Sequence, residues 1–407
     1  MKKYQSYFLL LFSLLFIISC KTEKENTKLK IGFWRGEITI QEQQLPFVFE
    51  ILKNEENFKI NLHDGDNNIE LNEVKVVNDS IFFTMHIFDI DVKAKINDNS
   101  LNGTFTKNYA DDYVLPFKAT FGKKERIDNA TSNHKFDGKW TINLHKDDGT
   151  DNTTIGLFKT EDNKLKGTIL TKTGDYRFLE GTTNGDKFTL YAFDGNHMFI
   201  FKAKLENDTL KGDFWSGKTF HQKFTGYKNE NASLPDANKL TYLKEGFDKI
   251  EFSFPNLEGN LVSLDAPKYK DKVVILQVFG TWCPNCMDET KFYAKWYDKN
   301  KDRGVEIIGL AYEVKDDFEY AKARVNKVKK AYNVNYDYLI AGTSDKGNAS
   351  KSLPMLNHIM SFPTSIIIDK KGKVRSIHTG FSGPATGDYY LHYVEVFNTL
   401  MDKLLSE

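Results

Sequence analysis

Two of the three cysteines in the chain stand three positions apart, in the run TWCPNC at residues 281–286. Such a pair can hold a metal ion, form a structural disulfide or exchange electrons with other thiols. Metal binding is disfavoured, because the sequence offers no second cysteine pair and no clear histidine pair to complete a zinc site. Redox exchange is the leading interpretation, and a structural disulfide is its alternative. The histidines of the first half are scattered without ligand spacing and are interpreted as surface or strand residues: His63, His86, His134, His145, His197 and His221.

The residues around the two sulfurs predict unequal roles for them. Cys283 is expected to cap a helix whose first residue is Pro284, where the missing N–H costs nothing. Free N–H groups and the helix dipole at such a position lower a thiol pKa from ~8.5 to between about 3.5 and 7.5. Cys283 is therefore expected to be the exposed nucleophile, and Cys286, one turn further in, the buried thiol that resolves the mixed disulfide. Pro284 and Asn285 would tune the redox potential.

Two neighbouring side chains extend this candidate site. Glu289 follows Cys286 by three residues on the same face of the predicted helix, where a semi-buried carboxyl can pass a proton to or from that thiol. The alternative for Glu289 is a solvated carboxylate near the start of the helix. Trp282 is expected to lie over the disulfide, with a packing role as its alternative.

The pattern from residue 250 onward alternates strands and helices, as the positioning of such a site requires. The apolar run 273–279 predicts a strand covered on both faces, immediately before the cysteine pair. Residues 287–303 predict a helix that ends at Gly304, and residues 316–332 space their apolar side chains as an amphipathic helix does. Further elements are predicted at 305–312, 338–340, 365–369, 374–379 and 388–405.

The region 31–228 shows short alternating runs broken by Asn, Asp and Gly, which predict antiparallel strands. This region also repeats itself. Gly-x-Trp at 32–34 returns at 138–140, and Gly103 returns as Gly212. Two barrel- or sandwich-like β modules are therefore predicted, with the tryptophan of each motif in the core. They are interpreted as core-forming spacers rather than as a ligand cavity or a docking face.

The start of the chain has the order of features of an export signal. Two lysines precede the apolar run 8–18, which is too short for a membrane span of about 20 residues. The run ends in a motif that resembles the bacterial lipoprotein cleavage box, in which Cys20 would become the lipidated N-terminus. Residues 21–30 are polar and read as a tether. Lys21 is not the aspartate associated with inner-membrane retention, which favours the outer membrane.

Composition limits the other classes of function. The chain has 407 residues, enough for two to three domains. It carries 56 basic and 56 acidic residues, and this balance argues against a nucleic-acid binder or a polybasic protein of membrane surfaces.

A strand followed by Trp-Cys-x-x-Cys at the start of a helix, in a secreted chain, resembles the thioredoxin-fold thiol–disulfide oxidoreductases of the ResA/TlpA family. The resemblance covers residues ~250–405. Residues 252–264 resemble the hairpin that this family adds before the fold, and SFPT at 361–364 matches its cis-proline loop. The chain departs from many members at Asn285, where they have proline. Gln277 stands where cytosolic thioredoxins have a buried aspartate, although ResA-like members also carry an amide there.

The resemblance implies roles for particular residues and partners. Glu289 matches an active-site glutamate of ResA-like members. Pro363 would be cis and would leave the backbone of Phe362 free to pair with an extended substrate segment. The usual role in the family is a reductant of protein disulfides, fed electrons by a membrane thiol relay, with no organic cofactor. The alternative is a non-catalytic ligand-binding or assembly lipoprotein of the envelope with a structural disulfide.

These observations together predict a multidomain chain with an all-β N-terminal half and a C-terminal α/β domain. The predicted parts are a signal peptide at 1–19, a lipidated tether at 20–30, a first β module at 31–125, a second β module at 134–228, a linker at 229–249 and a thioredoxin-like domain at 250–407.

Overall fold

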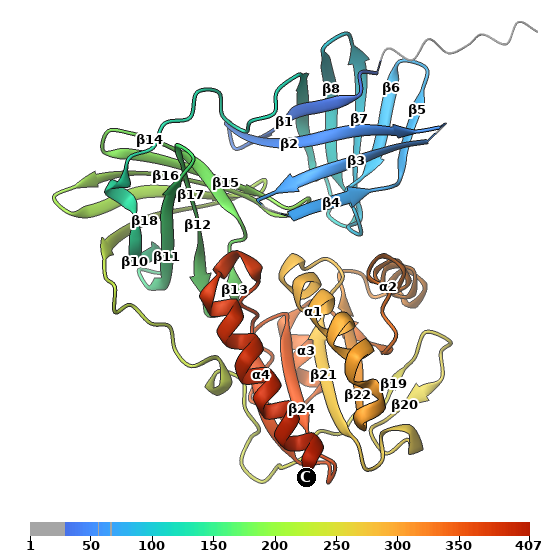
Figure 1. The fold of residues 1–407 in the computed structure, drawn as a ribbon. Coiled ribbons are helices and arrows are strands. Elements are labelled where there is room, and N and C mark those ends of the chain that lie inside the picture. The colour runs from blue at the N-terminus through green and yellow to red at the C-terminus, as the bar shows by residue number, and fades with distance from the viewer. Residues whose placement is uncertain (1–28, 56, 66) are drawn as a thin grey trace, which may run out of the picture.

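A computed structural model describes residues 29–55, 57–65 and 67–407 (Figure 1). The predicted signal peptide, Cys20 and most of the predicted tether lie outside the described residues. The described chain forms three parts in sequence order: a first β module, a second β module and a C-terminal α/β domain.

The first β module is one antiparallel sheet in the order β4-β3-β2-β1-β9-β8-β7-β6-β5, with β4 and β5 at its two edges. Strands β1 to β4 lie side by side in sequence order, and so do strands β5 to β9. Strand β1 pairs with both β2 and β9 and so joins these two sets into one sheet. The strands are β1 (Gly32–Ile40), β2 (Gln43–Asn54), β3 (Asn57–Asp64), β4 (Asn67–Leu71), β5 (Val74–Val77), β6 (Ser80–Thr84), β7 (Ile90–Asn97), β8 (Ser100–Lys107) and β9 (Val114–Phe121).

The second β module has the same plan and closes on itself. Its order is β11-β10-β18-β17-β16-β15-β14-β12-β13, and β11 also pairs with β12, which makes the sheet a barrel. The strands are β10 (Gly138–His145), β11 (Asp151–Glu161), β12 (Lys164–Thr171), β13 (Gly174–Asp175), β14 (Leu179–Asn184), β15 (Lys187–Phe193), β16 (Met198–Glu206), β17 (Thr209–Ser216) and β18 (Phe220–Lys228).

The repeated motifs occupy equivalent places in the two sheets. Trp34 on β1 and Trp140 on β10 are buried, and each indole N–H donates to the carbonyl oxygen four residues earlier, at 3.0 Å and 2.8 Å. A Cβ on Gly103 would lie 1.9 Å from the carbonyl oxygen of Lys93, and one on Gly212 would lie 2.3 Å from that of Lys202. Only glycine fits where neighbouring strands approach so closely. The predicted repeat is therefore a structural one.

The thioredoxin-like domain is built on a sheet in the order β23-β22-β21-β24-β25. Strands β21, β22 and β23 are parallel, whereas β24 and β25 form an antiparallel hairpin. The strands are β21 (Val273–Phe279), β22 (Val305–Glu313), β23 (Asp337–Thr343), β24 (Thr364–Ile368) and β25 (Val374–Thr379), with the small hairpin β19 (Phe254–Pro255) and β20 (Leu261–Val262) before them. The helices are α1 (Pro284–Asn300), α2 (Phe318–Tyr332), α3 (Lys346–Ser352) and α4 (Asp388–Ser406).

Aromatic side chains pack α4 against α1 in this domain. Phe397 of α4 packs edge-on against Phe292 and Trp296 of α1, with ring centroids 5.2 Å apart in both pairs. The sequence predicted α1, α2 and α4 from their apolar spacing. It missed α3, a helix of 7 residues in which only Ala349 is buried, so no apolar periodicity announces it.

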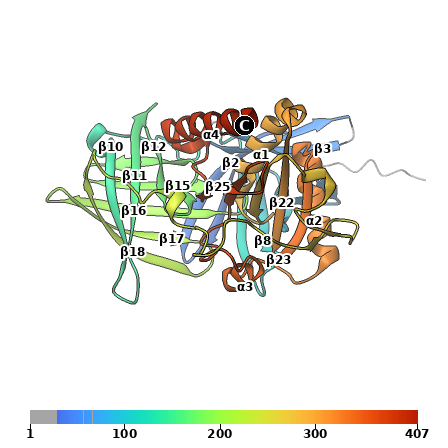
Figure 2. The ribbon, with the colours of Figure 1, turned by 90° about the horizontal axis from the view of Figure 1, so that it is seen from below.

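The three parts pack against one another rather than hang on free linkers (Figures 1 and 2). Phe47 of the first module packs against Phe193 of the second in a tilted arrangement, with ring centroids 4.3 Å apart. His86 of the first module lies 2.9 Å from the hydroxyl of Tyr332 on α2. Residues 229–249 run along the thioredoxin-like domain, where the N–H of Thr241 donates to the hydroxyl of Thr379 at 3.2 Å.

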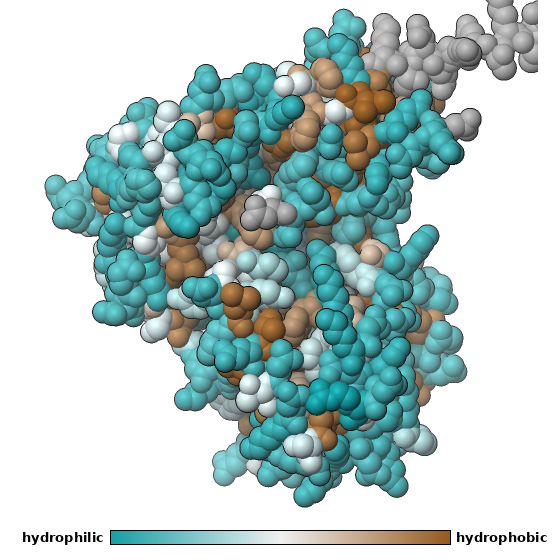
Figure 3. All heavy atoms as spheres, in the orientation of Figure 1, coloured by the Kyte–Doolittle hydropathy of each residue, from teal (hydrophilic) through white to brown (hydrophobic). Residues whose placement is uncertain are grey.

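The surface drawn in Figure 3 is mostly hydrophilic, and its hydrophobic side chains gather in separate small groups. None of the helices in the described part of the chain is long and apolar enough to cross a membrane.

Candidate active site

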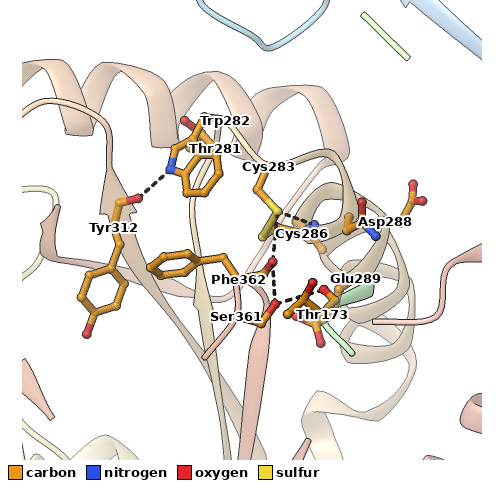
Figure 4. Close-up of a disulfide and its surroundings, with 12 residues drawn as sticks. Thr173, Thr281, Trp282, Cys283, Cys286, Asp288, Glu289, Tyr312, Ser361 and Phe362 are labelled. Atoms are coloured by element: carbon orange, nitrogen blue, oxygen red, sulfur yellow. Dashed lines mark hydrogen bonds between the residues drawn. A yellow bond between two sulfur atoms is a disulfide. The ribbon is translucent and has the colours of Figure 1, made fainter. Parts of the chain in front are cut away.

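Cys283 and Cys286 form a disulfide at the N-terminus of α1 (Figure 4). Cys283 is the N-cap residue, and its sulfur accepts the N–H of Cys286 at 3.2 Å. Pro284 is the first helical residue, and the carbonyl oxygen of Cys283 accepts the N–H of Met287 at 3.1 Å. Strand β21 ends at Phe279, so a short turn carries the chain from the buried sheet to this helix start. The structure places Cys283 at the helix cap and Pro284 at the first helical position, as the sequence predicted.

The loop before β24 lies against the disulfide. The Phe362–Pro363 peptide bond is cis, and the carbonyl oxygen of Phe362 is 3.4 Å from the sulfur of Cys283. The Phe362 ring meets Trp282 edge-on, with centroids 5.6 Å apart, and the Trp282 indole N–H donates to the carbonyl oxygen of Tyr312 at 2.9 Å. Trp282 therefore packs beside the disulfide, and its position is fixed by the contact of its ring with Phe362 and by the hydrogen bond of its N–H.

Glu289 is fully buried, so the interpretation of it as a solvated carboxylate is wrong. One carboxylate oxygen accepts the hydroxyl of Ser365 at 2.6 Å, and the other accepts the amide N–H of Gln277 at 3.0 Å. Burial raises the pKa of Glu289 to about 7, because desolvation outweighs these two hydrogen bonds, which favour the charged form. The carboxyl can therefore both hold and release a proton near neutral pH.

The second β module lies directly on the redox site. The carbonyl oxygen of Thr173 accepts the hydroxyl of Ser361 at 3.0 Å, next to the cis-proline loop. The side-chain amide of Asn285 donates to the carbonyl oxygen of Asp175 at 3.2 Å, and that of Asn196 donates to the carbonyl oxygen of Trp282 at 2.6 Å. We call residues 171–175 together with Asn196 the cover.

The cover corrects two expectations. Cys283 was expected to be exposed, but only 6% of its surface is accessible. The β modules were interpreted as spacers, yet the second module supplies hydrogen-bond partners to residues on both sides of the cysteine pair. Asn285, where many ResA-like proteins have proline, is one of those residues, and a proline could not donate this bond.

A buried arginine joins all three parts beside the site. Arg177 of the second module forms an ion pair with Asp288 of α1, and its side chain also lies 3.1 Å from Asp194 and 3.8 Å from Asp64 of the first module. Its backbone N–H donates to Asp175 at 2.8 Å. Burial raises the pKa of Asp64 to about 7, and the charge of Arg177 opposes this rise. We call these five residues the Arg177 cluster.

Sequence reasoning missed Arg177 and its partners, because each of them reads as an ordinary surface charge within its own module. It also missed the hydroxyls of Ser365 and Tyr293 around Glu289. Tyr293 lies buried on α1, and its hydroxyl donates to Ser365 at 2.8 Å. Gln277 was noted only as the amide that stands where cytosolic thioredoxins have a buried aspartate, and its bond to Glu289 was not predicted. In the described part of the chain, no group of three or more His, Cys, Asp or Glu side chains is placed to hold a metal ion.

Comparison with known proteins identifies the second half of the chain. Residues 248–377 match the AhpC/TSA family. Thiol-disulfide oxidoreductase ResA of Bacillus cereus is 33% identical over 137 residues, which cover 34% of this chain and 70% of that protein. The chain belongs to the ResA family of thiol-disulfide oxidoreductases. ResA of Bacillus subtilis is 28% identical over 155 residues, 38% of this chain and 76% of that protein. Among solved structures, the thioredoxin domain of a thiol-disulfide oxidoreductase from Bacteroides vulgatus is 25% identical, with 38% of this chain and 99% of that chain covered and a TM-score of 0.29.

Membership of the ResA family gives the disulfide its chemical meaning. The enzyme exchanges a dithiol for a disulfide through a thioredoxin fold, and Cys283 and Cys286 are the only cysteines in the described part of the chain. The structural-disulfide alternative raised by the sequence is thereby set aside.

Proposed function

We propose that this chain is a lipid-anchored reductant of the bacterial cell envelope, which transfers electrons from the Cys283–Cys286 dithiol to disulfides of protein substrates. The observation that carries the proposal is the position of the Cys283 sulfur. It caps α1, accepts the N–H of Cys286 at 3.2 Å and lies beside the carbonyl oxygen of Phe362. A sulfur at a helix N-terminus is stabilised as a thiolate, and the thiolate is the attacking species.

The exchange proceeds in two displacement steps. The Cys283 thiolate attacks one sulfur of the substrate disulfide, the substrate S–S bond breaks, and one substrate thiolate leaves. The Cys286 thiolate then attacks the sulfur of Cys283, which releases the second substrate thiolate and forms the Cys283–Cys286 disulfide. Two electrons pass to the substrate. A membrane thiol relay restores the dithiol by the reverse steps, so no organic cofactor takes part.

Glu289 acts as the proton carrier of the second step. Cys286 is fully buried and must lose its proton before it can attack. The carboxylate of Glu289, one turn further along α1, accepts that proton and returns it when the dithiol is restored. A pKa of about 7 suits a group that has to accept and donate in turn near neutral pH.

Five further residues shape the site in this proposal. The Phe362 backbone and Pro363 bind an extended substrate segment, and Trp282 forms part of the same surface. Pro284 and Asn285 tune the redox potential through their effect on the reduced form. The hydrogen bond between Ser361 and Thr173 shows that the cover now lies next to this loop, so protein substrates reach it when the cover moves aside.

The location rests on the sequence alone: the charged start, the apolar run 8–18 and Cys20 stand in the order of a lipoprotein export signal. Lipidation at Cys20 would hold the enzyme at a membrane, with the outer membrane favoured. The test is detergent partitioning of the native protein and of Cys20→Ala. Recovery of the native protein in the aqueous phase would remove lipidation from the proposal.

The catalytic roles are tested by trapping. Cys286→Ala should accumulate mixed disulfides with substrates, because no thiol is left to resolve them. Cys283→Ala should accumulate few, because the remaining thiol is buried. Iodoacetamide labelling across pH, followed by mass spectrometry of trapped adducts, measures both. Faster labelling of Cys286 than of Cys283 would reverse the assignment, and a measured potential of the couple decides between reductant and oxidant.

A further inference from the structure

Glu289 has no exposed surface, so the proton that it takes from Cys286 needs a way out. The cover lies over the cysteine pair, and Cys283 itself is only 6% accessible. The two hydrogen bonds of Glu289 lead in different directions. Gln277 is an amide, and its N–H does not give up a proton near neutral pH. Ser365 carries a hydroxyl, which can accept one proton and donate another.

Three hydroxyls form a continuous line that starts at Glu289. Ser365 donates to Glu289 at 2.6 Å, and Tyr293 donates to Ser365 at 2.8 Å. The hydroxyl oxygens of Tyr293 and Tyr393 are 3.3 Å apart. Ser365 lies on β24, Tyr293 on α1 and Tyr393 on α4, so the packing of α4 against α1 and the sheet completes the line.

The line runs beside a cavity of about 620 Å³. This cavity lies between the second β module, residues 232–238 and α4, and Ser365, Tyr293 and Tyr393 are all among its lining residues. Val396, also in its lining, is half exposed, so the cavity reaches the molecular surface. It is large enough to hold several water molecules, each of which occupies about 30 Å³ in the liquid.

We propose that Ser365, Tyr293 and Tyr393 form a proton path between Glu289 and this cavity. The inference rests on the proton-carrying role proposed above for Glu289. It assigns to these three hydroxyls a step of the exchange reaction and to the cavity the function of a water reservoir.

The transfer balances at every oxygen. When Cys286 gives its proton to Glu289, the new carboxyl O–H turns toward Ser365 and donates to it. Ser365 passes its own proton to Tyr293, and Tyr293 passes its proton to water in the cavity or to Tyr393, which passes one on. Each hydroxyl gains one proton and loses one. The bonds seen in the structure, with Ser365 and Tyr293 both donating toward Glu289, are the arrangement for the ionised carboxylate.

The titratable groups near Glu289 and the path carry no charge that would repel a proton. The titratable side chains that interact with Glu289 are the tyrosines Tyr293, Tyr336 and Tyr393, all with a pKa raised by burial, so they stay neutral at working pH. His378, whose ring lies tilted against that of Tyr393 with centroids 5.0 Å apart, also lines the cavity. Burial lowers its pKa to about 4, so it carries no charge that would repel a proton.

The experiment measures the resolving step alone in the full-length protein. Reduced enzyme is loaded at Cys283 with glutathione as a mixed disulfide, and glutathione release is followed across pH in H₂O and in D₂O. Tyr293→Phe should slow release by about tenfold or more, since general acid–base steps contribute about 10²–10⁴ in rate. Ser365→Ala should act in the same way, whereas Ser365→Thr, which keeps the hydroxyl, should restore the rate.

Tyr297→Phe is the matched control. Tyr297 is on the same helix, and its hydroxyl donates to Glu306 at 2.9 Å, outside the path. Equal slowing in Tyr293→Phe and Tyr297→Phe, with no change in the solvent isotope effect, would overturn the path. A wild-type rate in Tyr293→Phe beside a slow Glu289→Gln would also overturn it and leave the role of Glu289 intact. A wild-type rate in Glu289→Gln would instead overturn the proposed role of Glu289.

Discussion

Glu289 shows how the burial of a carboxyl can cost stability and at the same time give it the pKa that the proposed proton transfer needs. Ser365 and Gln277 are arranged to stabilise its charged form, but its complete burial makes that form costly. The result is a group whose pKa is raised to about 7 and which therefore changes charge in the pH range where thiols are exchanged. The same compromise has a consequence for the folding equilibrium.

Glu289 should make the protein less stable as the pH rises from about 4.5 to 7. In this range the unfolded chain loses the carboxyl proton while the folded protein keeps it, so ionisation favours unfolding. The stability is fully present below the unfolded pKa and is lost as pH passes through the folded pKa. Above pH 7 the penalty is about 3 kcal/mol, at 1.36 kcal/mol for each unit of pKa.

Denaturant titration of the oxidised protein and of Glu289→Gln between pH 4 and 8 measures this effect. The difference in unfolding free energy between the two proteins should change over that interval in favour of the variant. Asp64, whose pKa is also raised to about 7, is present in both proteins and cancels in the difference. A pH-independent difference would show that Glu289 ionises normally.

The strands of the two β modules depend on glycines at which neighbouring backbones meet. A methyl group on Gly103 would collide with the carbonyl oxygen of Lys93 across the β7–β8 pair. The equivalent contact in the second module lies between Gly212 on β17 and Lys202 on β16. The repeat thus preserves a steric requirement of each sheet as well as a pattern of core residues.

Gly103→Ala should lower the stability of the first module by about 1–3 kcal/mol, the usual cost of overpacking. Thr104→Ala, at the exposed neighbouring position on the same strand, is the control and should have little effect. Thermal melts followed by circular dichroism in the β-sheet region compare the two variants. Equal melting temperatures would show that the strands can shift to accept the methyl group.

At the level of the element, the loop that joins β12 to β13 is part of the cover. Asn285 holds it from the side of α1, so Asn285→Ala should loosen the cover. Alkylation of the reduced protein by iodoacetamide at Cys283 should then be several-fold faster at a pH at which both proteins carry the same thiolate fraction. Asn348→Ala, on the surface of α3, serves as the control. Unchanged alkylation would mean that this bond does not restrain the cover.

At the level of the whole molecule, the Arg177 cluster is the place where the three parts meet. Arg177 is 3% exposed, and its carboxylate partners come from the first module, the second module and α1. Buried charges of this kind favour one packed arrangement of the parts, because a different packing that keeps Arg177 buried leaves its charge unpaired away from water. Asp288 of the cluster is two residues beyond Cys286 and Asp175 belongs to the cover, so the arrangement that the cluster selects is the one with the cover closed.

Arg177→Met should therefore open the molecule. Removal of one partner of a buried ion pair typically costs about 3–5 kcal/mol. We expect a lower melting temperature, faster alkylation of Cys283 and a larger radius of gyration by small-angle scattering. Lys327→Met removes an ion pair with Glu73 that also joins the first module to α2 but lies near the surface, and should change each readout little. An unchanged radius in Arg177→Met would show that other contacts hold the parts together.

The sequence predicted those parts of the fold that are specified locally. The capping of α1 by Cys283, the buried strand β21 and the cis-proline loop each follow from a few adjacent residues or from a short family motif. The β repeat follows from the recurrence of Gly-x-Trp and of Gly103 as Gly212. The cover could not be predicted, because Thr173 meets Ser361 and Asn196 meets Trp282 only through packing of separate modules. Nothing near Arg177 in the chain shows that its partner is Asp288, and no short motif connects Ser365 to Glu289.

The closed cover also has a consequence for how partners are selected. If a substrate binds only the open form, its apparent dissociation constant is the intrinsic value divided by the fraction of molecules that are open. The closed cover then weakens the binding of every substrate protein by the same factor, whatever residues the substrate places against the cis-proline loop. A protein that binds the face of the second β module uncovered by opening would raise that fraction for all substrates at once. The β modules would then govern when the dithiol is available, and the loop would govern to which disulfide.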